Sequence, residues 1–260
     1  PGDIDALAKQ LEKNDKKGGT ACVLIEPVGP ESGTRPIPFE YNKAARELCD
    51  QYGALLIFDE VVTGFRLGLK GAQGYFGVKP DLTVFGKCIA GGYPMAGGVG
   101  GKKEFMGYCA AGIESGKKRA YVGGTLSANP LSCCAGYWAI KEIERTDACV
   151  KAGRAGDRAT KGLQEIIEKH NLPYVVYNQG SIVHLETSAV MLLDIMDPVA
   201  LEEAKPRKHL IEEMGCAYMA EGVITIGGSR LYTMLAHTDE IIDDAIQRLE
   251  RVYKNSEAFK

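Results

Sequence analysis

A carboxylate and an amine stand at the ends of two short apolar runs in the first half of the chain. Asp59 follows the run Ala54–Phe58, and Lys87 comes two residues after the run Leu82–Phe85. Both runs are typical of strands that are buried on both faces of a parallel sheet covered by helices. Because ligands of open α/β sheets bind at the carboxyl ends of the strands, Asp59 and Lys87 are predicted to face one small molecule.

Two cofactor chemistries can use an acid and a lysine at strand ends. The first is ATP hydrolysis, since an apolar strand ending in Asp59-Glu60 could hold magnesium. That chemistry requires a phosphate loop of the form GxxxxGK[ST], and no Gly-Lys pair in the chain has these neighbours. The second is pyridoxal phosphate, which needs a lysine for a Schiff base and an acid that keeps its pyridine nitrogen protonated. Lys87 and Asp59 supply both groups, and the apolar neighbours of Lys87 favour a nucleophilic amine.

Three motifs extend this interpretation, in the order LIFDEVVTGFR, KPDLTVFGKCIAGGYPMAG and GGTLSANPLSCCAG. They resemble successive signatures of the class III, fold-type I pyridoxal-phosphate aminotransferases, and in particular the branch that contains glutamate-1-semialdehyde aminomutase. The resemblance covers nearly the whole chain but only the later part of the family's length. It implies that the first sheet strands, the helix that cradles the phosphate and the ring-stacking aromatic precede Pro1, lie on another chain or have been lost.

The resemblance also implies roles for individual residues of this sequence. Lys87 would carry the cofactor as a Schiff base and move a proton, and Asp59 would hold the pyridine nitrogen. Val61 would pack on the cofactor ring. Thr125 matches a threonine that binds the phosphate of the neighbouring subunit's cofactor, which implies a homodimer. Val62 stands where many members have a glutamine, and the aminomutase branch also has an apolar residue there.

A carboxylate-binding pair is implied by two further positions. Arg230 precedes an apolar run, at the place where many class III aminotransferases have an arginine for the substrate carboxylate. A guanidinium suits this role because it binds a carboxylate through two parallel hydrogen bonds. Glu31 falls where ω-amino-acid aminotransferases have a glutamate that pairs with this arginine when another group fills the site. The alternative is a surface arginine and a loop glutamate that do not touch.

The expected activity is therefore the transfer of an amine from an amino-acid donor to a keto-acid acceptor through Lys87. Two alternatives remain open. An aminomutase of the glutamate-1-semialdehyde type would move the amine within one molecule. A non-catalytic fragment or partner chain would lack the cofactor contacts that precede Pro1.

The composition argues against several classes of binding partner. The 260 residues include 31 basic and 34 acidic side chains, a formal net charge of −3, so nucleic acid is not expected. No apolar run reaches the roughly 18 residues of a membrane helix. The eight cysteines lack the spacing of metal ligands, so we expect no metal site, a reducing compartment and a cytoplasmic protein.

The pattern of elements predicts two domains: residues 1–146, a mostly parallel α/β domain that binds pyridoxal phosphate and is incomplete at its N-terminal side, and residues 147–260, a smaller α/β domain. In the first, we expect a helix over Glu40–Tyr52 that stops at Gly53, a loop over Thr63–Gly77, and a helix over Leu131–Glu144 with Trp138 in the core.

In the second domain, helices are expected over Gly153–Lys169, Val199–Met214 and the segment from Thr238 to about Tyr253. The predicted strands are Tyr174–Tyr177, Ile182–Glu186, Met191–Ile195, Val223–Ile226 and Leu231–Leu235.

Overall fold

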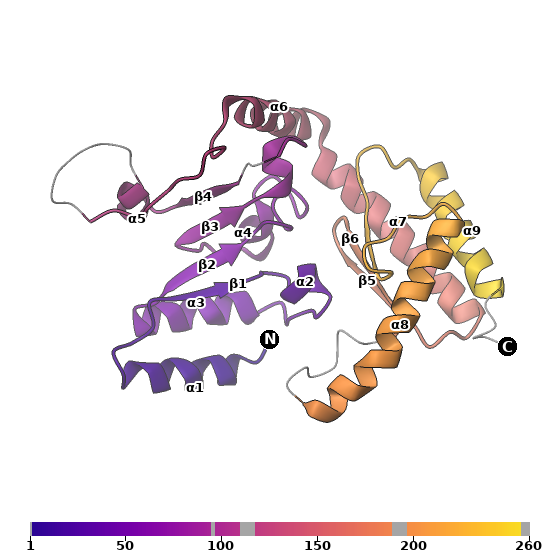
Figure 1. The fold of residues 1–260 in the computed structure, drawn as a ribbon, viewed down its shortest axis with the longest axis horizontal. Helices are drawn as coiled ribbons and strands as arrows, with labels where there is room; N and C mark the ends of the chain where they lie inside the picture. The colour runs from indigo at the N-terminus through magenta and orange to yellow at the C-terminus, as the bar shows by residue number, and fades with distance from the viewer. Residues whose placement is uncertain (1, 95–96, 110–117, 189–196, 256–260) are drawn as a thin grey trace. The chain divides into compact units, whose positions relative to one another are not determined.

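The computed structural model describes residues 2–94, 97–109, 118–188 and 197–255. The chain divides into two compact units, Pro1–Thr146 and Asp147–Lys260, each with its own sheet and helices (Figure 1).

The first unit is built on a four-stranded sheet in the order β1-β2-β3-β4. The strands are β1 (Cys22–Ile25), β2 (Leu55–Asp59), β3 (Leu82–Phe85) and β4 (Gly98–Gly101). The first three are parallel, which confirms the mostly parallel α/β class, and β4 is antiparallel to β3. The sequence predicts only turns at β4, because three of its four residues are glycines. Its strand conformation comes from pairing with β3.

The helices of the first unit are α1 (Ile4–Asp15), α2 (Pro30–Gly33), α3 (Tyr41–Tyr52), α4 (Gly71–Phe76), η1 (Lys87–Ala90), α5 (Lys103–Met106), η2 (Gly107–Cys109) and α6 (Pro130–Thr146). Helix α3 ends at Gly53 in the left-handed conformation, as predicted. The expectation of an unbroken loop over Thr63–Gly77 is wrong, because α4 forms inside it. The carboxylate of Glu60 accepts hydrogen bonds from the backbone N–H groups of Ala72 and Gln73 and so caps α4.

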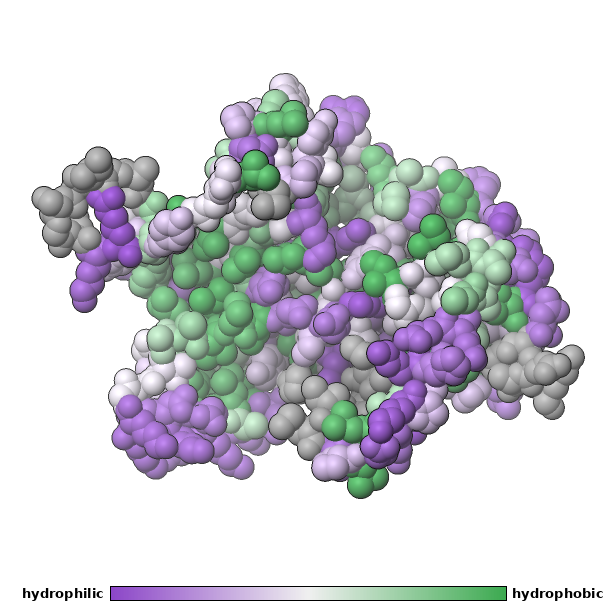
Figure 2. All heavy atoms as spheres, viewed as in Figure 1, coloured by the Kyte–Doolittle hydropathy of each residue, from purple (hydrophilic) through white to green (hydrophobic). Residues whose placement is uncertain are grey.

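Among the described residues, one face of this sheet has a closed apolar core and the other does not. Leu56 and Phe58 are fully buried on the face that packs with α3. On the other face Leu24 is 59% exposed and Val99 51% exposed. The prediction that the strands are buried on both faces is therefore wrong for the described residues. Figure 2 shows apolar side chains gathered over the strands of this sheet.

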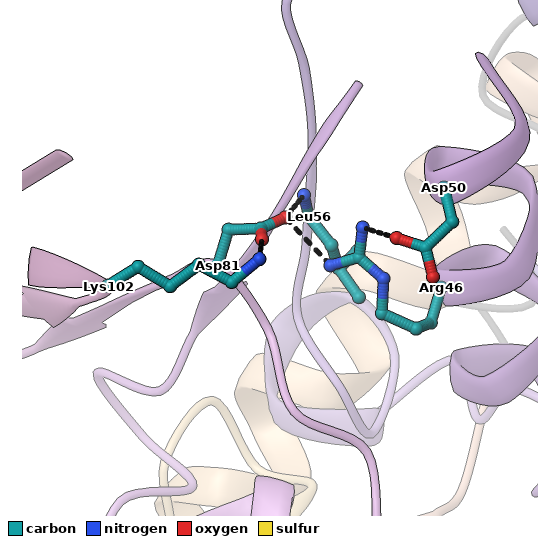
Figure 3. A network of polar contacts seen from close by, with 5 residues as sticks. All are labelled: Arg46, Asp50, Leu56, Asp81 and Lys102. Atoms are coloured by element: carbon teal, nitrogen blue, oxygen red, sulfur yellow. Dashed lines mark hydrogen bonds and ion pairs between the residues drawn. The ribbon is translucent and has the colours of Figure 1, made fainter. Parts of the chain in front are cut away.

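The amino ends of the strands are held together by the carboxylate of Asp81 (Figure 3). Its Oδ2 accepts from the backbone N–H of Leu56 and from the guanidinium of Arg46, both at 2.7 Å. Its Oδ1 lies 2.6 Å from the ammonium of Lys102, just after β4. Arg46 also binds the exposed Asp50. Burial alone would raise the pKa of Asp81, but the bonds from Lys102 and Arg46 hold it below its usual value.

The second unit contains the antiparallel strands β5 (Val175–Gln179), β6 (Ile182–Glu186) and β7 (Arg230–Tyr232), in that order. Its helices are α7 (Ala148–Lys169), α8 (Pro198–Ala220) and α9 (Asp239–Asn255). The predicted strand Val223–Ile226 is wrong: that segment contributes a single bridge, between Ile226 and Arg230. The predicted strand Met191–Ile195 lies outside the described residues.

The core of the second unit lies on one face of its sheet. Val176, Val183 and Leu185 face α7, α8 and α9 and join one apolar cluster with residues such as Leu163 and Leu249. Residues that alternate with them along β5 and β6 point to the opposite face. No helix among the described residues is both long and apolar enough to cross a membrane.

Candidate functional site

Asp59 and Lys87 lie at the same edge of the first sheet. Asp59 is the last residue of β2 and pairs with Val84 of β3. Lys87 follows Val84 by three residues and opens η1. Since β2 and β3 are parallel, both residues emerge at the carboxyl edge, where ligands of such sheets bind.

Asp59 is half-buried, and its carboxylate binds the backbone two residues further along the chain. Its Oδ1 accepts a hydrogen bond of 3.0 Å from the backbone N–H of Val61. A cavity of about 400 Å³ opens beside it, lined also by Ile25, Glu26 and Tyr41. Asp59 therefore offers a fixed negative charge to a small molecule at this edge.

Lys87 sits in a strained backbone position. It has φ of 51°, in the left-handed region that L-residues rarely adopt. The turn after it presses on α6, because a Cβ at Gly91 would meet the backbone of Ala135. Such strain persists only where the surroundings enforce it and gathers at functional sites. The apolar surroundings expected for Lys87 are wrong, since its side chain is exposed and open to a ligand.

Val61 packs directly on the turn between β3 and Lys87. It is half-buried, and a Cβ at Gly86 would come within 3.0 Å of its Cγ1. A glycine immediately before Lys87 therefore lets Val61 and the turn approach closely.

Thr125 lies in an exposed turn that leads into α6. The residues around it are apolar and exposed: Tyr121 is 92% accessible, and Val122 and Leu126 are more than half accessible. The expectation that Trp138 belongs to the core is wrong, because it is 64% exposed on α6. Exposed apolar side chains therefore lie both on α6 and in the segment before it.

Glu31 lies in α2, a short and irregular helix whose shape depends on Glu26. Glu31 and Ser32 both have positive φ, at 55° and 61°. The Glu26 carboxylate accepts from their backbone N–H groups at 3.1 and 3.0 Å, which holds this conformation. A Cβ at Gly29 would collide with the carbonyl of Arg35. The sequence reasoning missed Glu26, although an acid directly after an apolar strand is the signal that singled out Asp59.

Arg230 is the first residue of β7 and is half-buried. It belongs to the second unit and Glu31 to the first, so their pairing stays a prediction. His184, opposite Arg230 on β6, is fully buried and stacks on Tyr177.

The ATP interpretation needs Glu60 as a second acid for magnesium, and Glu60 is already occupied by bonds within the chain. Glu60 is buried, and its oxygens accept from Thr63, Ala72 and Gln73. A carboxylate with these bonds caps a helix and has little capacity left for a metal ion. Within the described residues no group of three or more His, Cys, Asp or Glu side chains is arranged to hold a metal.

Comparison with known proteins identifies the family. The family model described as aminotransferase class-III matches residues 3–253. The chain belongs to the class-III aminotransferase family. This class-III chain is 43% identical over 181 residues to the glutamate-1-semialdehyde 2,1-aminomutase of Legionella pneumophila (strain Corby), covering 69% of this chain and 40% of that protein.

Solved structures give the same fold. An ω-transaminase from Sphaerobacter thermophilus matches with a TM-score of 0.81 and 26% identity over 98% of this chain and 56% of its own. A transaminase solved with PLP bound matches with a TM-score of 0.78 and 23% identity over 97% of this chain and 56% of its own. These matches confirm the fold-type I class. The class-III chain spans less than two thirds of the length of each relative.

The residues of the class-III chain fit two groups of pyridoxal phosphate, its ring nitrogen and the group that joins a lysine. Asp59 supplies a negative charge beside a cavity, and Lys87 supplies an accessible amine at the same sheet edge. Val61 adds an apolar surface next to the turn that carries Lys87. An acid for the ring nitrogen and a lysine for the Schiff base are two of the groups that this cofactor requires.

Proposed function

We propose that this protein transfers amino groups from an amino-acid donor to a keto-acid acceptor with pyridoxal phosphate. The observation that carries the proposal is that Asp59 and Lys87 both emerge at the carboxyl edge of neighbouring parallel strands. When bound, pyridoxal phosphate supplies an electron sink for the bond that breaks at the substrate carbon.

The residues of the chain have distinct tasks in this proposal. Asp59 holds a proton at the ring nitrogen, because its fixed carboxylate stabilises the positive charge there. Lys87 would hold the cofactor through Nζ, and the same atom would accept and return a proton at the substrate carbon. Val61 would offer the cofactor an apolar surface. Arg230 binds the substrate carboxylate, and Glu31 pairs with Arg230 when the substrate has none.

An aminomutase is the second candidate. The 43% identity to a glutamate-1-semialdehyde 2,1-aminomutase supports it, as does Val62, an apolar residue where many transaminases have glutamine. An aminomutase uses the same Asp59 and Lys87 but returns the nitrogen to the molecule from which it came.

A nitrogen-transfer experiment distinguishes the two. The full-length protein is given pyridoxal phosphate, a panel of ¹⁵N-amino acids and unlabelled keto acids, and in a second arm ¹⁵N-labelled glutamate-1-semialdehyde alone. Label in the keto-acid partner supports transamination. Label that stays in the semialdehyde skeleton, at a new carbon, supports the aminomutase. If the label moves in neither arm, both functions are rejected.

We also propose a homodimer in which Thr125 binds the phosphate of the partner's cofactor. The exposed apolar side chains around Thr125, on Tyr121, Val122 and Leu126, support an interface at this turn. Mixing Thr125→Val with Lys87→Ala subunits tests it. A mixed dimer has one doubly damaged site and one intact site, so activity should partly return. Mixed dimers that stay inactive would show that Thr125 acts within its own subunit.

As the location we propose the cytoplasm. None of the eight cysteines, all of which lie in the described part of the chain, forms a disulfide, and four of them are exposed, which is typical of a reducing compartment. Cell fractionation with a compartment marker tests this, and recovery outside the cytoplasmic fraction would reject it.

A further inference from the structure

A second cavity of the first unit lies on the face of the sheet that α4 covers. Its volume is about 480 Å³, and its wall includes the apolar side chains of Phe65, Leu69 and Phe85. Thr83 of β3 faces α4, because its Oγ1 accepts a hydrogen bond of 3.4 Å from the side-chain amide of Gln73. Phe85 is two positions further along β3 and so points to the same face. This α4 cavity has a size and an apolar wall that suit a small organic molecule.

The α4 cavity is separate from the candidate site but close to it. Among the described residues it shares none of its lining with the cavity beside Asp59, and neither Asp59 nor Lys87 lines it. Phe85, however, stands only two residues before Lys87. Phe65 has φ of 61°, in the left-handed region that L-residues rarely adopt. Because backbone strain of this kind gathers at ligand sites, the α4 cavity is a candidate for a ligand of its own.

Two lysines give the α4 cavity a positive charge. Lys70 and Lys79 both line it and are exposed, and its described lining includes no Asp or Glu. Within the described part of the chain neither lysine forms an ion pair. The stem of Lys70 lies along α4, because a Cβ at Gly74 would collide with its Cβ and would come within 3.4 Å of its Cγ and Cδ. Ammonium groups beside an apolar wall attract an anion that has an apolar body.

We propose that the α4 cavity binds a small aromatic carboxylate, with the ring against Phe65 and Phe85 and the carboxylate at Lys70 and Lys79. The aromatic wall favours a flat ring, and the two lysines select an anion over a neutral or cationic ring. The limited volume favours a small molecule over a segment of protein. This inference does not depend on the proposed function, since it involves neither Asp59 nor Lys87.

Isothermal calorimetry on the full-length holoenzyme, with 2-naphthoate as the probe, tests the proposal. One naphthoate should bind per chain. Lys70→Gln combined with Lys79→Gln should weaken this binding about tenfold, because both charged contacts are lost. The uncharged 2-naphthamide has the same ring and should bind equally well to wild type and to the double variant.

The matched control is Lys43→Gln combined with Lys103→Gln, which makes the same change of charge in the same unit. Both lysines are exposed, on α3 and α5, and neither lines the cavity, so naphthoate affinity should not change. Leu69→Glu is an independent variant, expected to fold because Leu69 is 48% exposed. Its carboxylate lies on the cavity wall and repels the probe, so binding should weaken at least tenfold.

Three results would overturn the proposal. Naphthoate that does not bind to the full-length holoenzyme would mean that another part of the protein, or a second copy, fills the cavity. An equal loss in the control variant would show only a general attraction of charge. Binding that is lost in Arg230→Gln but kept in the Lys70 and Lys79 double variant would place the probe at the site of the proposed function. Wild-type protein that transfers no amine, yet binds naphthoate through Lys70 and Lys79, rejects the proposed function alone and supports the α4 cavity.

Discussion

Charged residues at the two ends of the sheet in the first unit have opposite environments. At the amino end, the buried carboxylate of Asp81 is saturated by Arg46, Lys102 and the backbone of Leu56 (Figure 3). At the carboxyl end, Asp59 is half-buried beside a cavity and Lys87 is exposed.

The difference shows how a sheet separates stability from chemistry. A charge whose partners are all within the chain holds strands in register and has no capacity for a ligand. A charge with an open side contributes less to folding and can meet a substrate or cofactor. Both Asp59 and Asp81 adjoin apolar strands, so their environments and not their residue type assign these tasks.

The largest effect on activity is expected at the carboxyl end, from Lys87→Ala. Amine transfer should fall by about 10²- to 10⁴-fold, the usual contribution of a group that moves a proton, and further where covalent attachment is essential. Thermal stability should not fall, because the side chain is exposed. Turnover and thermal unfolding are measured on the same samples, with Lys103→Ala on α5 as control. Retained turnover in Lys87→Ala would contradict the assignment.

Asp59→Asn should lower the single-turnover rate by about 10²-fold while the cofactor still binds, because a neutral amide stabilises a protonated ring nitrogen poorly. Asp50→Asn is the matched control near the other end of the sheet, where Asp50 is exposed and forms an ion pair with Arg46. An unchanged rate in Asp59→Asn would remove Asp59 from the site.

Asp81→Asn tests the amino end and should have the reverse profile. It leaves Arg46 and Lys102 without their shared carboxylate, so the free energy of unfolding should fall by about 3 kcal/mol. Activity per folded molecule should stay within about twofold of wild type. Urea unfolding gives the first quantity and active-site titration the second. Normal stability with lost activity in Asp81→Asn would mean that the amino end serves activity and not stability, which contradicts the comparison.

A smaller effect is expected from acid. The pKa of Asp81 is lowered in the folded protein, so its contribution to stability is fully present above the unfolded-state value of about 4. The contribution is lost as pH falls further, through the folded-state pKa. Urea midpoints of wild type and Asp81→Asn should therefore converge below about pH 4. A constant difference from pH 7 to pH 2 would contradict this.

The sequence predicted the elements whose own side chains encode them. The apolar runs at β2 and β3 predicted parallel strands, and Gly53 predicted the end of α3. Helix α4 was missed because its cap comes from Glu60, eleven residues before it, which local periodicity cannot register. Strand β4 was missed because three of its four residues are glycines, which show no alternation of apolar and polar side chains.

The residues of the candidate site also fall into those that the sequence could predict and those that it could not. Asp59 and Lys87 could be found because strand ends are visible in the sequence. Glu26 was missed, although an acid directly after an apolar strand was its signal, because its bonds to the backbone of Glu31 and Ser32 depend on the folded turn.

Borohydride reduction of the full-length holoenzyme tests the central claim most directly. Reduction fixes the link between cofactor and lysine, and peptide mass mapping then locates the pyridoxyl group. The account predicts a single modified residue, Lys87, and no modification in Lys87→Ala. A pyridoxyl group on any other lysine, with Lys87 unmodified, would contradict it.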